Sequence, residues 1–254
     1  MPDNLIDTAQ SVVPFLIVAG GDALDLWLED QPDRIRNWVA ATGFKANSGS
    51  ICLIANEAGN LQLVLGGTGD NDIANLWTWA ALHNDLPAGN YRLDECLDEE
   101  QATQAALGWA VAGYSFDRYS SNELGKCGPS LVWPEACDRE QVIRTVQAIF
   151  LVRNLINTPA NDMGPKQLAG CAQALAKNYN AQCSVIVGKD LLKANFPAIH
   201  AVGRASVNAP RLIDMQWGNG SNPKVTLVGK GVCFDTGGLN LKETSGMKLM
   251  KKDM

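Results

Sequence analysis

Lys230, Asp235, Lys242 and Asp253 lie near the C-terminal end of the sequence, in the glycine-rich stretch VGKGVCFDTGGLNLKETSGMKLMKKDM (228–254). Asp235 follows Lys230 by five residues, and Lys242 and Asp253 follow at intervals of seven and eleven residues. Carboxylate oxygens suit hard or borderline divalent cations, and one carboxylate can bridge two metal ions about 3.5–4 Å apart in hydrolytic sites. The residue types allow a two-metal hydrolytic site, but the spacing alone favours an ordinary glycine-rich loop with solvated charges.

The two lysines would need opposite protonation states in such a metal site. An amine binds a metal only when it is neutral, so a cation would have to displace the proton of a group whose ordinary pKa is about 10.4. A lysine that keeps its proton would instead stabilise an oxyanion that develops during the reaction. One stretch can therefore supply both a metal ligand and an electrophile.

The segment before the first lysine has the pattern of a buried strand, KVTLVG (224–229). Chemistry in open α/β sheets gathers at the carboxyl ends of the strands, which is where Lys230 follows. Two further apolar runs, CSVIVG (183–188) and RLIDMQW (211–217), predict two more buried strands. Pro165 is placed to open a helix over the segment between residues 165 and 179.

The first half of the chain alternates strand-like and helix-like patterns, which favours a layered α/β domain. The predicted elements are a strand, a helix, a hairpin and two helices, over VVPFLIVAG (12–20), DRIRNWVAATGF (33–44), SICLIANEAGNLQLVLGG (50–67), DIANLWTWAALHNDLP (72–87) and EEQATQAALGWAVAGY (99–114). A loop is predicted from Gly128 to Pro134.

A long helix is predicted to begin after Asp138, which stands three residues before Gln141 as in a capping box, and to end at Thr158-Pro159. We therefore predict a domain over residues 1–137, and a linker helix with the first part of a second α/β domain over residues 138–254.

Other residue types that often carry chemistry have ordinary structural explanations. Glycines 66, 67 and 69 match neither a dinucleotide-binding loop nor a Walker motif, which favours a structural turn over a nucleotide site. His83 and His200 are predicted as surface or capping residues, and two histidines are too few for a histidine metal cluster. Trp77, Trp79 and Trp109 fall in predicted helices, where packing is the expected role.

The composition indicates a folded, acidic protein of the cytoplasm. The 254 residues carry a net charge of −6, which argues against nucleic acid as the default partner. The seven cysteines are scattered and odd in number, as expected for reduced thiols. The N-terminus lacks the basic region of a signal peptide, and no stretch approaches the ~18 apolar residues of a membrane span.

The C-terminal stretch closely resembles the motif of the leucyl aminopeptidase (cytosol aminopeptidase) family, V-G-K-G-x-x-F-D-[ST]-G-G-x-x-x-K followed by G-M-x-x-M-K-x-D-M. RNLINTPANDMGPKQLA (153–169) is similar to the R-N-L-x-x-x-P-x-N-x-x-x-P segment of the same family, while the N-terminal part resembles the family only in layout. Cys233 and Thr236 are mild departures. Lys248 stands where the family often carries an acid, which bears on substrate preference.

The resemblance implies a role for each matching residue. Lys230 would bind the tighter of two metals, Asp235 would bridge both, and Asp253 would be a further ligand of the tighter site. Lys242 would be the catalytic electrophile that polarises the scissile carbonyl. Met250 would form a wall of the pocket for an apolar first side chain, so that Lys230, Asp235, Lys242 and Met250 together contact the substrate.

The resemblance implies a metal-dependent aminopeptidase that releases N-terminal, leucine-like residues from peptides. It implies two divalent ions per complete site, Zn²⁺ or Mn²⁺ first and Mg²⁺ or Co²⁺ as alternatives, and a hexameric homo-oligomer. Its fold would be an N-terminal three-layer α/β domain joined by a long helix to the first part of a zinc-exopeptidase-like α/β catalytic domain.

The family's N-T-D-A-E-G-R motif, which supplies further ligands, does not occur in these 254 residues. We therefore expect half of the ligand set to be missing and the isolated chain to be inactive. The competing hypothesis is a non-catalytic binding or assembly protein that retains the N-terminal domain.

Overall fold

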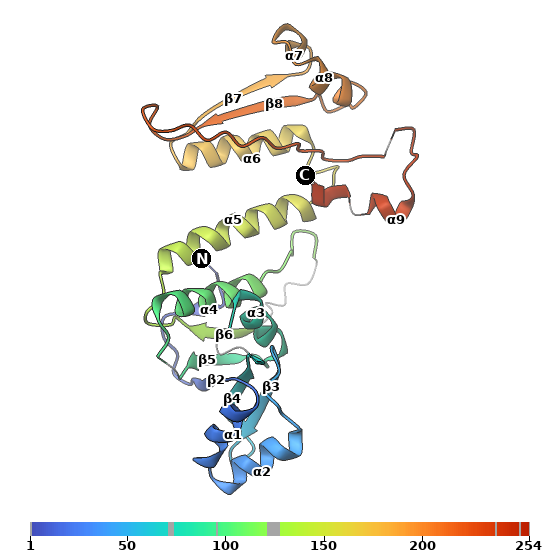
Figure 1. Cartoon of the computed structure of the whole chain (residues 1–254). Coiled ribbons are helices and arrows are strands. Elements are labelled where there is room, and N and C mark those ends of the chain that lie inside the picture. Colours follow the sequence, from blue (N-terminus) through green and yellow to red (C-terminus); the bar gives the residue numbers. More distant parts are fainter. Residues whose placement is uncertain are drawn as a thin grey trace. The chain divides into compact units, whose positions relative to one another are not determined.

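The computed structural model describes residues 2–70, 74–94, 96–120, 128–236, 238–248 and 250–253 (Figure 1). The chain divides into two compact units, Met1–Leu151 and Val152–Met254. The predicted boundary at residue 137 stays a prediction.

The N-terminal unit is built on a six-stranded sheet in the order β1-β6-β5-β2-β4-β3 (Figure 1). The adjacent strands pair in parallel, except that β3 is antiparallel to β4. The strands are β1 (Leu5–Ile6), β2 (Val13–Val18), β3 (Ile51–Ala55), β4 (Leu61–Gly67), β5 (Gly89–Leu93) and β6 (Pro129–Val132). The predicted first strand and hairpin are confirmed.

Helices cover both faces of this sheet because successive residues of its central strands point to opposite sides. Phe15 and Val64 join a large core with the helices α3 (Leu76–Asp85), α4 (Glu99–Ala112) and α5 (Arg139–Asn157). Leu65, the next residue of β4, joins a smaller core with α1 (Asp22–Glu29) and α2 (Asp33–Thr42). The unit therefore has three layers, as the sequence predicts.

Aromatic rings fill the larger core. The Phe15 ring makes edge-to-face contacts with Trp79, Tyr91 and Trp109, with ring centroids 6.0–6.4 Å apart. Trp79 and Trp109 are buried, which confirms their predicted packing role, whereas Trp77 is exposed. The burial of the three tryptophans differs. Trp79 and Trp109 contact Phe15 of the sheet, whereas Trp77 lies in the first turn of α3, two residues after the N-cap residue of that helix, Asn75.

The structure corrects two predictions for this unit. Residues 129–132 form the strand β6 rather than a loop, because their backbone pairs with β1 on one side and β5 on the other. Proline is compatible with this strand because it stands at the first position. His83 is a buried residue rather than a surface residue, since the helix α3 turns it toward Trp109.

The glycines that follow the strand LQLVL have a structural role. A Cβ atom on Gly67 would lie 2.3–2.5 Å from backbone atoms of Ala46 and Asn47, closer than real Cβ atoms come. The end of β4 and the segment at Ala46 are also joined by a hydrogen bond from the Gly69 amide to the Ala46 carbonyl at 2.8 Å. Glycine at position 67 therefore allows two backbone segments to pack directly against each other.

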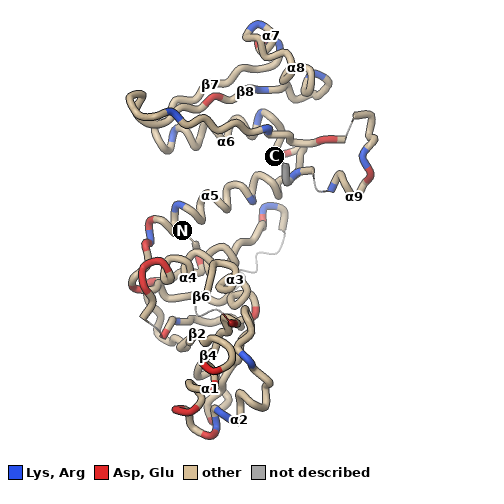
Figure 2. Tube along the Cα trace, viewed as in Figure 1, with Lys and Arg blue, Asp and Glu red and all other residues tan. Residues whose placement is uncertain are grey.

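Acidic side chains gather on α1 and at the start of α4 (Figure 2). Asp98 caps α4 by accepting a hydrogen bond from the Gln101 amide at 2.8 Å, and Glu99 and Glu100 follow in the first turn. Negative side chains in a first turn are stabilised by the helix dipole. The helix dipole therefore accounts for the acidic residues at the start of α4.

The C-terminal unit contains a two-stranded antiparallel sheet, β7 (Gln182–Val187) with β8 (Arg211–Gln216), against which the helix α6 (Pro165–Asn178) packs. Pro165 opens α6, and Asp138 caps α5 through the Gln141 amide at 2.9 Å, so both predicted helix starts are confirmed. The remaining helices are α7 (Asp190–Lys193), α8 (Pro197–Gly203), α9 (Thr244–Met247) and the 3-10 helix η1 (Met250–Asp253).

The prediction of a third buried strand over residues 224–229 is wrong for this structure. The segment has no strand pairing, and Val225, Leu227 and Val228 are 82%, 92% and 92% exposed. A strand persists only where its backbone groups meet a neighbouring strand, and β7 and β8 pair with each other alone in the described part of this unit.

No helix within the described residues is long and apolar enough to cross a membrane.

Candidate metal and catalytic site

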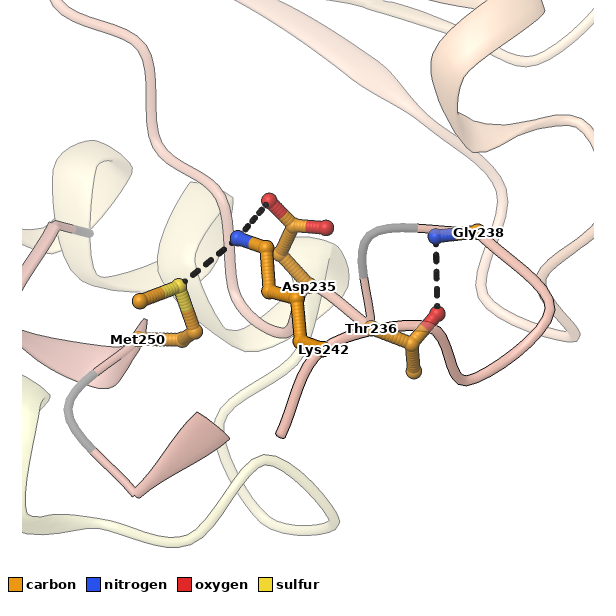
Figure 3. A network of polar contacts seen from close by, with 5 residues as sticks. All are labelled: Asp235, Thr236, Gly238, Lys242 and Met250. Atoms are coloured by element: carbon orange, nitrogen blue, oxygen red, sulfur yellow. Dashed lines mark hydrogen bonds and ion pairs between the residues drawn. The ribbon is translucent and has the colours of Figure 1, made fainter. Parts of the chain in front are cut away.

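The predicted site residues Asp235, Lys242 and Met250 meet through their side chains (Figure 3). The Lys242 ammonium Nζ donates a hydrogen bond to Asp235 Oδ2 at 2.8 Å and a second one to Met250 Sδ at 2.9 Å. The side chains of Lys242 and Asp235 are 32% and 39% exposed, so water screens part of the attraction between their charges. One lysine therefore joins the turn that carries Asp235 to the start of η1.

A tight turn brings Asp235 and Lys242 together. The Lys242 amide donates to the Thr236 carbonyl at 2.9 Å, and the Gly238 amide donates to Thr236 Oγ1 at 3.2 Å. Leu239 and Asn240 adopt φ angles of 49° and 57°, in the left-handed region. The turn reverses the chain direction so that the two charged side chains face each other, at the cost of an unfavourable backbone conformation at Leu239.

A cavity of about 200 Å³ lies beside this ion pair and is lined by Lys230, Val232, Asp235 and Met250. The structure thus brings together four of the five predicted site residues, Lys230, Asp235, Lys242 and Met250. Asp253 belongs to η1, and its side chain lies outside the described part of the chain, so its predicted role as a ligand stays a prediction.

The donors of this cavity fit a divalent cation in type. Asp235 offers carboxylate oxygens, and Lys230 offers an amine that can serve as a ligand once it loses its proton. Within the described residues, no group of three His, Cys, Asp or Glu side chains could hold a metal ion. Lys230 and Asp235 therefore account for two donors, and a complete coordination shell needs others.

Lys251 is a neighbour of the site for which no role was predicted, although it matches the fixed lysine of the family motif. Its ammonium Nζ donates to the Met163 carbonyl at 3.5 Å, which connects η1 to the segment that precedes α6. Burial lowers the pKa of Lys251 and raises the pKa of the adjacent Cys233 thiol, because each group loses water around its charged form. The position of Lys251, two residues before Asp253 in the same motif, is the signal that could have found it.

Two protein-family models and several known proteins match this chain. Residues 13–127 match the model of the M17 aminopeptidase N-terminal domain, and residues 150–254 match the model of the cytosol aminopeptidase family catalytic domain. A probable cytosol aminopeptidase of Xanthobacter autotrophicus is 30% identical over 219 residues, which cover 80% of this chain and 43% of the relative. The two family models together cover both units.

Solved structures give the same result for the fold. The cytosol aminopeptidase of Coxiella burnetii is similar with a TM-score of 0.87 and 41% identity, over 99% of this chain and 54% of that chain. The bottromycin maturation enzyme BotP, in complex with Mn, is similar with a TM-score of 0.74 and 26% identity, over 95% of this chain and 52% of that chain.

The chain spans about half the length of these relatives, between 43% and 54%. Its N-terminal three-layer unit corresponds to one family domain, and the unit that carries the lysine and aspartate site falls in the other. This chain belongs to the cytosol aminopeptidase family.

Proposed function

We propose that this chain carries part of the site of a metal-dependent aminopeptidase that releases N-terminal, leucine-like residues from peptides. The observation that carries the proposal is that Lys230, Asp235 and Met250 line one small cavity and that Lys242 contacts both Asp235 and Met250 beside it. All four residues belong to the motif that carries the family resemblance. A divalent cation bound there would supply a Lewis acid that polarises the scissile carbonyl.

Each predicted site residue has a separate task in this proposal. Asp235 and Lys230 hold the metal side of the cavity, with Asp253 as a further ligand. Lys242 keeps its proton and stabilises negative charge on the carbonyl oxygen, for which a flexible ammonium is suited. Met250 provides an apolar, adaptable surface for the first side chain of the peptide.

The proposal includes two metal ions, Zn²⁺ or Mn²⁺, for a complete site. The likeness to BotP, which was solved in complex with Mn, supports a divalent cation of this kind. We also propose a hexameric assembly. We propose that it is located in the cytoplasm, which is supported by the names of the relatives as cytosol aminopeptidases. Because only two donors are in place among the described residues, we expect the isolated chain to hydrolyse peptides poorly.

The metal site can be tested by measuring Zn²⁺ and Mn²⁺ binding to the chain by calorimetry. We expect Asp235→Asn to weaken binding at least about tenfold, since it removes the carboxylate charge that faces the cavity. Asp214→Asn is the matched control, because Asp214 is an exposed aspartate on β8. Unchanged binding in Asp235→Asn would show that the proposed metal site is wrong.

The aminopeptidase reaction can be tested by producing the chain together with the C-terminal half of a full-length relative and following the release of nitroaniline from leucine p-nitroanilide. Lys242→Met should lower kcat by about 10²-fold or more, the range for loss of one group that stabilises an oxyanion. A pair of chains that binds metal at Asp235 yet releases no leucine would favour the non-catalytic alternative.

A further inference from the structure

If Asp235 bridges two metal ions, as the resemblance implies, both of its carboxylate oxygens are needed as ligands, and Lys242 occupies one of them, Oδ2. The Lys242 ammonium lies 2.8 Å from Asp235 Oδ2, which is the distance of a direct charge-assisted hydrogen bond. The distance from a divalent cation to a carboxylate ligand is shorter still, about 2.0–2.6 Å across zinc, magnesium and calcium sites. Two cations on one oxygen would repel each other strongly at that separation.

We propose that Lys242 is the internal counter-ion of Asp235, and that a cation binding at this carboxylate must displace the Lys242 ammonium from Oδ2. The proposal rests on the metal site proposed above. In this proposal Lys242 first controls whether Asp235 Oδ2 is available to the metal, and only then acts on the substrate. Metal binding and the release of Lys242 are then one coupled event.

Met250 gives the displaced ammonium a second partner. Met250 Sδ accepts from the same Nζ at 2.9 Å (Figure 3). Met250 also lines the cavity with Lys230 and Asp235. The lysine can therefore give up its contact with Oδ2 and keep its contact with the thioether. This movement would leave a positive charge beside the cavity, unbound by Asp235 and available to a carbonyl oxygen.

Pairing with Lys242 also has a cost for metal affinity. The ion pair is about one-third exposed, so breaking it costs as much as breaking a partly screened surface pair rather than a fully buried one. We expect Lys242→Met to tighten Zn²⁺ binding about fivefold, since the carboxylate no longer has to release a counter-ion. Lys242→Arg keeps the charge and should stay within about twofold of the original chain.

Lys248→Met is the matched control for the loss of one positive charge nearby. Lys248 is exposed and lies in the same C-terminal segment as Lys242, directly after α9. We expect this variant to change Zn²⁺ affinity by less than about twofold, because screening by salt weakens charges that make no direct contact. Far-UV circular dichroism and the unfolding midpoint check that all variants remain folded.

The displacement itself can be followed by NMR of the lysine side-chain ammonium groups, with the Lys242 signal assigned from its loss in Lys242→Arg. Addition of Zn²⁺ should move the Lys242 signal in the original chain. In Asp235→Asn, where the ion pair is absent, the chemical shift of the Lys242 ammonium should differ from that of the original chain before any Zn²⁺ is added. Addition of Zn²⁺ should then change this chemical shift little.

The outcomes separate this inference from the proposed function. Loss of Zn²⁺ binding in Asp235→Asn, together with equal affinities for Lys242→Met and Lys248→Met, would leave the metal site in place and overturn the displacement. A Lys242 signal that stays unchanged as Zn²⁺ binds would overturn it as well. Zn²⁺ binding that does not depend on Asp235 would overturn both the metal site and the displacement.

Discussion

At the scale of single residues, His83 shows how burial changes the pKa of a side chain that the sequence predicts as a surface or capping residue. Its Nε2 lies 3.4 Å from Asn4 Nδ2 and its Nδ1 lies 3.3 Å from Asn84 Oδ1. The ring also makes an edge-to-face contact with Trp109, with centroids 5.3 Å apart. Burial lowers the pKa of His83 from its ordinary value of 6.5, and the hydrogen bond to Asn84 offsets only part of that effect.

This lowered pKa predicts a loss of stability in mild acid. The unfolded chain takes up a proton on His83 as the pH falls through about 6.5, whereas the folded chain resists protonation until a lower pH. The contribution of His83 to the free energy of unfolding is therefore fully present above about pH 6.5 and decreases below it. We expect the free energy of unfolding to be lower at about pH 5.5 than at about pH 7.5, because the unfolded chain binds a proton on His83 that the folded chain resists.

Urea unfolding at the two pH values measures this effect in His83→Gln and in the original chain. Other groups also titrate in this range, so the decisive quantity is the difference in pH dependence between the variant and the original chain. His83→Gln should reduce the pH dependence. Equal pH dependence in both chains would contradict the role of His83.

At the scale of elements, two side chains of α2 protect the edge strand β3. The outward carbonyl of Leu53 accepts a hydrogen bond from Trp38 Nε1 at 2.9 Å, and the outward carbonyl of Ala55 accepts one from the Arg34 guanidinium. Arg34 also donates to Gln62 on the neighbouring strand at 2.6 Å. Unpaired carbonyls on an edge strand otherwise invite pairing with another chain.

Removing these two donors should therefore promote self-association through β3. We expect the weight-average sedimentation coefficient of the double variant Arg34→Ala with Trp38→Phe to rise with protein concentration. This rise should be steeper than that of the original chain. Phenylalanine keeps most of the ring that packs at position 38, so the change mainly exposes the Leu53 and Ala55 carbonyls. Arg144→Ala, which removes an exposed arginine of α5, is the control, and matching sedimentation in all three chains would count against this role.

At the scale of the whole molecule, the two units differ in how completely they bury their apolar residues. The N-terminal unit has two buried cores on the two faces of one sheet. The C-terminal unit has a two-stranded sheet and an apolar segment, Val225–Val228, that is exposed to water. The chain spans about half the length of its relatives.

Hydrogen exchange should show this difference directly. Amides of β2, β4 and β5 should exchange slowly, because each of these strands is hydrogen-bonded on both sides. Amides of residues 224–229 should exchange fast, because they take part in no described strand pairing. The amides of β8, which pairs on one side only, provide an internal reference. Slow exchange over residues 224–229 would instead support the buried strand that the sequence predicts.

The local elements and the family motif could be predicted from the amino-acid sequence alone. Helices such as α2, α4 and α5 follow from apolar spacing, and the start of α5 also follows from its capping residue Asp138. The motif that contains Lys230, Asp235 and Lys242 could be recognised because its spacing is fixed along the chain. Both kinds of information are local, so they can be read without knowledge of the fold.

Features that depend on distant partners became visible only in the folded chain. Residues 129–132 form a strand because β1 and β5 lie on either side of them, while residues 224–229 remain unpaired because no described strand lies beside them. The burial of His83 and the contact of Lys242 with both Asp235 and Met250 depend on chain reversals that no spacing rule contains. Strand pairing, burial and ion pairing are long-range interactions, and their energies exist only once the chain has folded.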